Sequence, residues 1–227
     1  MQTQKGSVRR ALFVLALAFA PPATAQVGAP PIAPTAPSAT AAALTPPAPP
    51  ARPDAELLRL LRAGGLVVYF RHTATDFSKN DQEMKSLDDC ANQRALTQQG
   101  RTQARKIGVE WKRLKIPAGQ VLASPYCRTR EVAQLMFGRY ERSNDVRGGP
   151  IEAGNERYAG LKRLLSTTPS PSSANLVISS HGNPYQAVAG PGNPYMAEGE
   201  AAVIRPQGNG GWEVLARIKA DEWPRLK

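Results

Sequence analysis

Leu66-Val67-Val68-Tyr69-Phe70-Arg71-His72 is an apolar run that stops at an arginine and a histidine. The valine and aromatic residues of this run predict a buried strand over 66–70. The chain holds only two histidines, and the second, His181, directly follows another strand-like run at 176–180. Because α/β proteins place their chemistry at the carboxyl ends of parallel strands, two histidines in matching positions indicate one active site.

The segments around these two runs alternate between helix and strand patterns. Helices are expected from Asp54 to Gly64-Gly65, over 98–115 with Thr97 as its cap, from Ser124-Pro125 to Phe137-Gly138, and over 154–166. A third strand is expected at 121–123, two turns at 182–185 and 192–195, and a hairpin of 201–205 and 212–218 at the end. This order predicts an α/β fold, a single three-layer α/β/α domain on a mostly parallel sheet.

The N-terminal part of the chain has the pattern of an export signal and a tether. Residues 1–25 combine a basic start, an apolar stretch at 11–20 and a small-residue cleavage site at 23–25. The apolar stretch is too short to span a bilayer, which takes roughly 20 residues. Residues 26–53 are rich in proline and alanine and predict an extended linker. We therefore expect secretion across the inner membrane, a periplasmic location, and a folded domain at 54–227 without a transmembrane segment.

The charge and the two cysteines restrict the possible functions. The formal net charge is +11, yet neither a basic stripe with interleaved aromatics nor a nucleic-acid-binding motif is present. The charge therefore fits anionic substrates, or solubility alone. Cys90 and Cys127 would meet an oxidising compartment after export, which predicts one disulfide across a loop of roughly 38 residues. This bridge would hold the polar loop at 73–96 against the helix after 124.

Other enzyme chemistries lack their residues in this chain. A cysteine phosphatase needs an arginine six positions after its cysteine, and neither cysteine has one. No Gly-x-Ser-x-Gly elbow of a serine hydrolase occurs. The two histidines have no partners at the spacing of zinc ligands, so no metal site is expected.

Four side chains could instead hold a phosphate. Each lies at a strand end or in the first turn of a helix, where side chains and free N–H groups converge on anions; they are Arg71, His72, Arg128 and His181. Guanidinium groups bind phosphate oxygens in pairs, and a neutral imidazole can attack phosphorus. Nearby positive charge keeps that imidazole unprotonated, and no cofactor is required.

These residues belong to four motifs that together resemble the histidine phosphatase superfamily, which has the phosphoglycerate-mutase-like fold. The motifs are Leu66 to His72, Leu96-Thr97-Gln98-Gln99-Gly100 with the four residues that follow, Ser124-Pro125-Tyr126-Cys127-Arg128 with the five that follow, and Leu176 to Gly182. They occur in the family's order, and the resemblance covers about 64–205. Thr73 and Val132 depart from the family pattern, which usually has glycine and often threonine there.

The resemblance implies a role for each residue. His72 would be the phosphorylated nucleophile, and Arg71, Arg128 and His181 would hold the phosphoryl oxygens. The general acid is expected to be Glu152, which lies where many members carry theirs. Four other carboxylates remain candidates for this role: Glu156, Asp76, Glu198 and Glu200.

The sequence therefore predicts an exported, metal-independent phosphatase that hydrolyses phosphate monoesters through a phosphohistidine. The substrate could be a phosphorylated small molecule, an envelope sugar or a phosphoprotein, and the oligomeric state is left open. A non-catalytic module of the same fold, binding anions or an envelope polymer, is the alternative hypothesis.

Overall fold

A computed structural model describes residues 54–149, 156–190 and 193–227 of the chain. The predicted signal at 1–25, the predicted linker at 26–53 and the expected general acid Glu152 lie outside the described residues. None of the helices in the described ranges is long and apolar enough to cross a bilayer.

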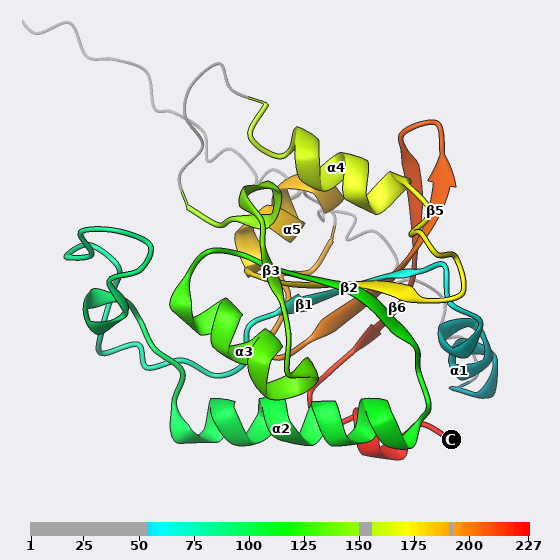
Figure 1. Ribbon diagram of the computed structural model, residues 1–227, viewed down its shortest axis with the longest axis horizontal. Helices are drawn as coiled ribbons and strands as arrows, with labels where there is room; N and C mark the ends of the chain where they lie inside the picture. Colours follow the sequence, from blue (N-terminus) through cyan, green and yellow to red (C-terminus); the bar gives the residue numbers. More distant parts are fainter. Residues whose placement is uncertain (1–53, 150–155, 191–192) are drawn as a thin grey trace, which may run out of the picture. The chain divides into compact units, whose positions relative to one another are not determined.

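A six-stranded sheet in the order β3-β2-β4-β1-β5-β6 organises the described part of the chain (Figure 1). Its strands are β1 Val67–Arg71, β2 Ala118–Ala123, β3 Glu141–Arg142, β4 Asn175–Ser180, β5 Ala201–Gly208 and β6 Gly211–Ile218. The first four in this order pair in parallel, whereas β5 is antiparallel to both β1 and β6. The mostly parallel sheet and the terminal hairpin predicted from the sequence are confirmed.

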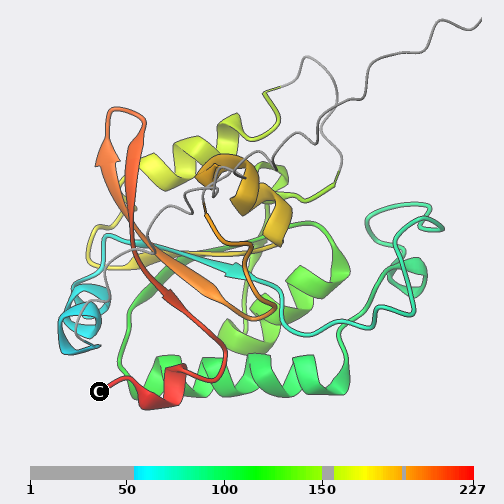
Figure 2. The same cartoon turned by 180° about the vertical axis from the view of Figure 1, so that it is seen from behind.

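Helices cover both faces of the sheet, as Figures 1 and 2 show from opposite sides. The helices are α1 Asp54–Ala63, α2 Gln98–Arg113, α3 Cys127–Phe137, α4 Ala159–Ser166 and α5 Gly182–Ala189. Val68 and Phe70 of β1 pack with α1, α2 and α3, while Val67 and Tyr69 pack with α4 and α5. Because successive side chains of a strand point to opposite faces, one apolar run supplies both cores. The three-layer α/β/α arrangement is confirmed.

The first turn of α2 fixes the position of residues 73–75, which directly follow His72. Thr97 caps the helix by accepting a hydrogen bond from the Gly100 backbone N–H at 3.0 Å. A Cβ on Gly100 would lie 2.1 Å from the Ala74 carbonyl oxygen, so only glycine permits this close approach. The segment from 73 to 75 therefore lies directly against the first turn of α2.

Two local predictions at the carboxyl end of the sheet are wrong. The helix expected from Ser124-Pro125 begins at Cys127, because the Ser124 hydroxyl bonds to His181 instead of capping a helix. The turn expected at 182–185 is the first turn of α5. Pro184 is tolerated there because the first N–H groups of a helix lack acceptors within the helix.

Candidate active site

The four predicted residues meet at one end of the sheet, beside the loop that extends to the left in Figure 1. They line a single pocket of about 210 Å³: Arg71, His72, Arg128 and His181. They converge because β2, β4 and β1 are neighbouring parallel strands that deliver α3, His181 and His72 to the same edge. The two imidazole centroids lie 5.5 Å apart, with their planes at 73°.

His72 is buried and has one free ring nitrogen. Its Nδ1 lies 3.0 Å from the Thr73 carbonyl oxygen, which can only accept, so Nδ1 carries the proton and Nε2 has the lone pair. Burial lowers the pKa of His72 to about 3; the bond to Thr73 opposes this shift, and the charges of Arg128 and Arg71 add to it. The imidazole is therefore neutral at physiological pH, as a nucleophile must be.

His181 is also buried and is oriented from three sides. Its Nε2 lies 2.8 Å from the Ser124 Oγ, and its Nδ1 lies 3.5 Å from Arg128 Nη2. Since a guanidinium only donates, Nδ1 acts as the acceptor and Nε2–H donates to the serine. Burial, reinforced by the charge of Arg128, holds the pKa of His181 well below its ordinary value. A Cβ on Gly148 would lie 2.7 Å from the His181 ring, so the missing side chain makes room for it.

Arg71 is fixed by the segment that follows α5. Its Nη1 donates to the Met196 carbonyl oxygen at 2.6 Å, and its guanidinium lies 5.2 Å from the centroid of the Tyr195 ring. Its Nη2 lies 3.7 Å from a carboxylate oxygen of Glu198, which is itself bonded by the Thr75 hydroxyl at 2.5 Å. The guanidinium therefore has a defined position at the edge of the pocket.

Arg128 already holds a carboxylate. Its Nη1 and Nη2 donate to the two oxygens of Asp81, both at 3.0 Å, and Asp81 also accepts from the Arg94 backbone N–H at 2.9 Å. The Arg128 side chain is only 5 % exposed, whereas Asp81 is 27 % exposed. These two guanidinium nitrogens are called the fork of Arg128 below. A phosphoryl group that binds to both of them has to replace the carboxylate of Asp81.

Arg94 is a third pocket arginine that sequence reasoning missed. It lines the pocket, and its carbonyl oxygen accepts a long hydrogen bond of 3.4 Å from Arg128 Nη1. Its guanidinium lies 4.7 Å from the centroid of the Phe77 ring, and no carboxylate of the described ranges pairs with it. Arg94 belongs to the polar loop at 73–96, whose lack of periodicity offered no signal for an inward-facing side chain.

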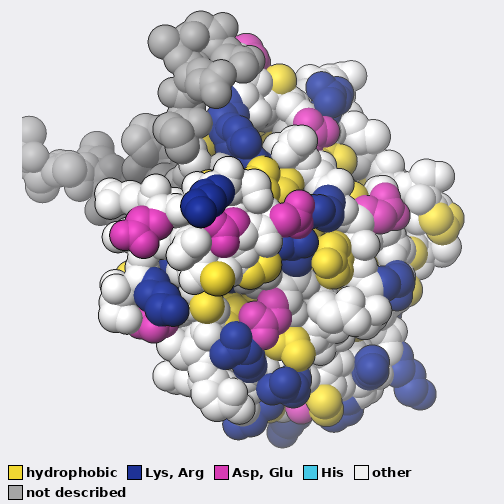
Figure 3. Space-filling model, turned by 60° about the vertical axis from the view of Figure 1, so that its left-hand side comes forward, with side chains coloured by type: hydrophobic (Ala, Val, Ile, Leu, Met, Phe, Trp, Pro, Cys, Tyr) yellow, Lys and Arg dark blue, Asp and Glu magenta, His cyan; other side chains and the backbone are white. Residues whose placement is uncertain are grey.

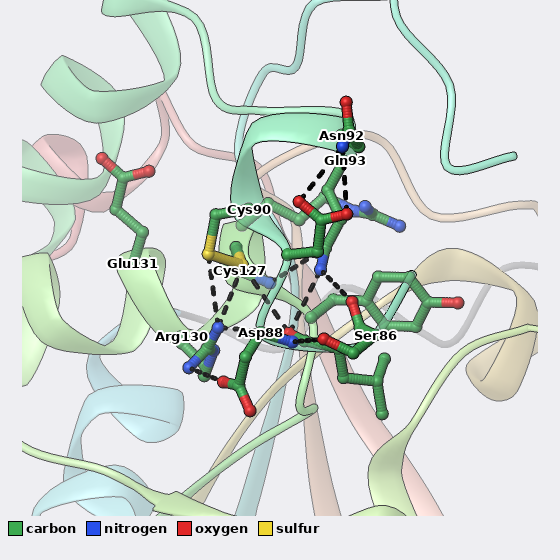
Figure 4. Close-up of a disulfide and its surroundings, with 12 residues drawn as sticks. Ser86, Asp88, Cys90, Asn92, Gln93, Cys127, Arg130 and Glu131 are labelled. Atoms are coloured by element: carbon green, nitrogen blue, oxygen red, sulfur yellow. Dashed lines mark hydrogen bonds and ion pairs between the residues drawn. A yellow bond between two sulfur atoms is a disulfide. The ribbon is translucent and has the colours of Figure 1, made fainter. Parts of the chain in front are cut away.

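The predicted disulfide between Cys90 and Cys127 is present and ties this loop to the first residue of α3. Figure 4 shows the bridge with Arg130 against both sulfur atoms, at 3.4 and 2.9 Å. Cys127 directly precedes Arg128, and its backbone N–H donates to Gln93 Oε1 at 2.9 Å. The bridge therefore fastens the loop that carries Asp81 and Arg94 to the start of α3.

The other four carboxylates proposed as general acid are not among the described residues that line the pocket. Glu198 lies 3.8 Å from His72 Nδ1, the ring nitrogen that carries the proton, and not at the free Nε2. Glu200 is buried in an ion pair with Arg217 at 2.6 Å. Asp76 closes a turn with Ser78, and Glu156 is exposed beside a different hollow. Among the residues of known placement that line the pocket, Asp81 is the only carboxylate.

Comparison with known proteins finds similarity at the level of structure. No protein-family model and no curated protein matches the sequence. The chain is similar to the protein histidine phosphatase SixA complexed with tungstate, with 19 % identity, a TM-score of 0.49, and coverage of 69 % of this chain and 98 % of that structure.

Two further structures align over similar lengths. A putative phosphohistidine phosphatase SixA from Agrobacterium tumefaciens has 14 % identity and a TM-score of 0.43, over 68 % of this chain and 97 % of its own. A mycobacterial glucosyl-3-phosphoglycerate phosphatase has 15 % identity and a TM-score of 0.47, and the alignment covers 66 % of this chain and 96 % of that structure. At this level of identity the similarity concerns the fold, and the chemistry of this chain has to be derived from the side chains around His72.

Proposed function

We propose that this protein is a phosphatase that hydrolyses phosphate monoesters through a phosphohistidine intermediate on His72. The observation that carries the proposal is the meeting of a neutral, buried imidazole with the guanidinium groups of Arg71, Arg94 and Arg128 in one pocket. Such a pocket binds a dianion and presents a nucleophile to it.

The reaction follows from the free lone pair on His72 Nε2. The phosphoryl oxygens bind to the arginine side chains, with Arg128 releasing Asp81, and His181 lies beside them. Nε2 attacks phosphorus, the bond to the leaving oxygen breaks, and that oxygen takes a proton. Water then attacks phosphorus, the N–P bond breaks, and inorganic phosphate leaves a neutral His72. The positive charges stabilise the negative charge that spreads over the phosphoryl oxygens, so the chain's own residues supply the electrostatic stabilisation.

The proton for the leaving group is assigned to Glu152 as a proposal, on the basis of its position in the sequence motif. Replacing Glu152 with glutamine tests this role. The expected result is slower hydrolysis of alkyl phosphates, which are poor leaving groups, and little change with nitrophenyl phosphate, whose leaving group needs no proton. Equal slowing of both substrates would contradict an acid role.

Action outside the cytoplasm, in the periplasm, is also part of the proposal. Its support is the export pattern of residues 1–25 together with the Cys90–Cys127 bridge, since disulfides persist in oxidising compartments. Fractionation of cells that express the full chain tests it. The mature protein is expected in the periplasmic fraction, and recovery of only the uncleaved chain in the cytoplasm would contradict it.

The mechanism is tested by comparing the full chain with its His72→Ala variant on nitrophenyl phosphate. We expect the variant to lose at least about a thousandfold in kcat, as when other catalytic nucleophiles are removed. Acid quenching of the unaltered enzyme during turnover should trap an acid-labile phosphoryl group that His72→Ala does not carry. Val109→Ala, an exposed site on α2, is the control. Equal rates for the His72→Ala protein and the unaltered one would refute the mechanism.

A non-catalytic anion-binding module is the second candidate, favoured by Asp81 already occupying the fork of Arg128. A different anion could replace this carboxylate on Arg128 without any covalent reaction. For an envelope polymer, however, a continuous basic track is expected, whereas Figure 3 shows basic and acidic side chains interspersed on the face that it presents. Phosphate binding without turnover or trapped phosphohistidine would select this candidate.

A further inference from the structure

We propose that the substrates of this pocket are phosphate esters of ring-bearing alcohols, with the ring held at the pocket mouth by Phe77 and Tyr195. These two side chains are called the aromatic rim below. The inference rests on the proposed function, because it assigns the leaving group of the same reaction.

Both residues of the aromatic rim are unusually exposed. Phe77 is 68 % exposed and Tyr195 is 57 % exposed; with Val109 they are the large hydrophobic side chains left exposed in the described ranges. Val109 lies on the outer surface of α2, whereas the two aromatic rings both contact arginines that line the pocket. An exposed apolar side chain needs no explanation by itself, but one ring that lines the pocket and a second ring against a pocket arginine indicate a binding surface.

Tyr195 is built into the phosphate pocket. Its ring lies 5.2 Å from the Arg71 guanidinium and lines the pocket. A Cβ on Gly182 would come within 2.5 Å of the ring's Cζ and hydroxyl, so the ring is seated where this glycine has no side chain. Gly182 directly follows His181, and the ring therefore stands beside a histidine of the phosphate site with more than half of its surface open.

Phe77 is held in the same way by another arginine. Its ring lies 4.7 Å from the Arg94 guanidinium, and Arg94 lines the pocket. The chain reaches Phe77 only five residues after the nucleophile His72. In both contacts the arginine lies over a ring face, the arrangement in which a cation attracts an aromatic quadrupole.

The size of the pocket decides where the leaving group lies. His72 is 1 % exposed and forms part of the floor, and the whole pocket holds about 210 Å³. A phosphoryl group in line with Nε2 therefore directs its leaving oxygen outward, towards the solvent side. A flat ring on that oxygen can stack on the exposed aromatic surfaces and on the guanidinium groups beside them. A short alkyl group gains little from either contact.

Binding of two non-hydrolysable phosphonates to the full chain tests this inference without depending on turnover. Benzylphosphonate and ethylphosphonate carry the same anionic group but differ in the ring. Calorimetry should give a lower Kd for benzylphosphonate by about tenfold, since aromatic contacts of this kind are worth about one decade in affinity. The variant Phe77→Ala/Tyr195→Ala should lose most of this preference, and Val109→Ala, matched in exposure, should keep it.

The outcomes separate this inference from the proposed function. If both phosphonates bind equally to the unaltered protein, or if the double variant retains the tenfold preference, the aromatic rim has no such role and the phosphate pocket stands. If neither phosphonate binds, the pocket is not a phosphate site, and both proposals fall. The comparison uses the ratio of the two Kd values within each protein, and circular-dichroism melts of the double variant and the unaltered protein check that the variant is folded.

Discussion

Replacing Asp81 with asparagine should make the protein bind inorganic phosphate more tightly. The carboxylate of Asp81 holds both terminal nitrogens of Arg128 at 3.0 Å, so a phosphate that takes this fork must first displace it. Asparagine keeps the size of the side chain but removes the charge. It offers Arg128 one carbonyl oxygen in place of two carboxylate oxygens, and the competing anion is gone.

The size of the effect follows from the exposure of the pair. Hydrogen bonds between charged groups are worth about 1.5–3 kcal/mol, and the 27 % exposure of Asp81 reduces this through solvent screening. The part of this interaction that remains after screening, about 1–2 kcal/mol, opposes phosphate binding. Its removal should lower the Kd for phosphate by roughly five- to thirtyfold. The unliganded variant should also melt earlier, because the buried Arg128 loses its ionic partner, and saturating phosphate should restore much of this loss.

Calorimetric titration with inorganic phosphate measures the affinity, and thermal melts with and without phosphate measure the stability. Glu83→Gln is the matched control, since this exposed residue lies on the same loop and its replacement removes the same charge. Equal or weaker phosphate binding by Asp81→Asn than by Glu83→Gln would refute the reasoning, because phosphate would then bind outside the fork of Arg128.

Three further outcomes are expected. Replacing Cys90 and Cys127 with serine should lower the free energy of unfolding by about 4 kcal/mol for a closed loop of this length, measured in urea; a change below about 1 kcal/mol would contradict the chain-entropy account. Gly148→Ala should weaken phosphate binding by at least about tenfold, because the new Cβ would lie 2.7 Å from the His181 ring; unchanged affinity would show that the ring is not held there. The His72 imidazole should not titrate between pH 8 and 5 in NMR spectra, because its pKa is lowered to about 3, and the His181 imidazole should titrate well below its ordinary value of 6.5. Since the unfolded chain takes up these protons below about pH 6.5, stability should fall as pH decreases from there, by up to about 1.4 kcal/mol per pH unit for each histidine, and a ring that titrates near 6.5 would contradict this.

Elements whose signals are local could be predicted from the sequence. The apolar runs before His72 and His181 form β1 and β4, and Thr97 caps α2 as its position indicated. The start of α3 was predicted wrongly because the Ser124 side chain bonds to His181, 57 residues away in the chain. A helix cap is predicted from the residues next to it in the sequence. The residue that takes the hydrogen bond of Ser124 instead follows a different strand, so the local sequence does not show it.

The site residues with a local signal could likewise be predicted from the sequence. Each of four residues lies at the end of a strand or in the first turn of a helix, and parallel strands bring such positions to one edge of a sheet. For this reason the sequence could name Arg71, His72, Arg128 and His181. The cysteine pair was also predictable, since only two cysteines are available to form a bridge.

The sequence by itself identified the candidate nucleophile and the candidate phosphate-binding residues, and it predicted the disulfide. Only the tertiary structure decided what surrounds them: Asp81 in the fork of Arg128, Arg94 as a third arginine, and the aromatic rim of Phe77 and Tyr195. These residues come from irregular segments, whose side chains follow no period. Their direction is set by contacts across the fold, such as the bridge from Cys90 to the start of α3, and such contacts exist only when the chain is folded.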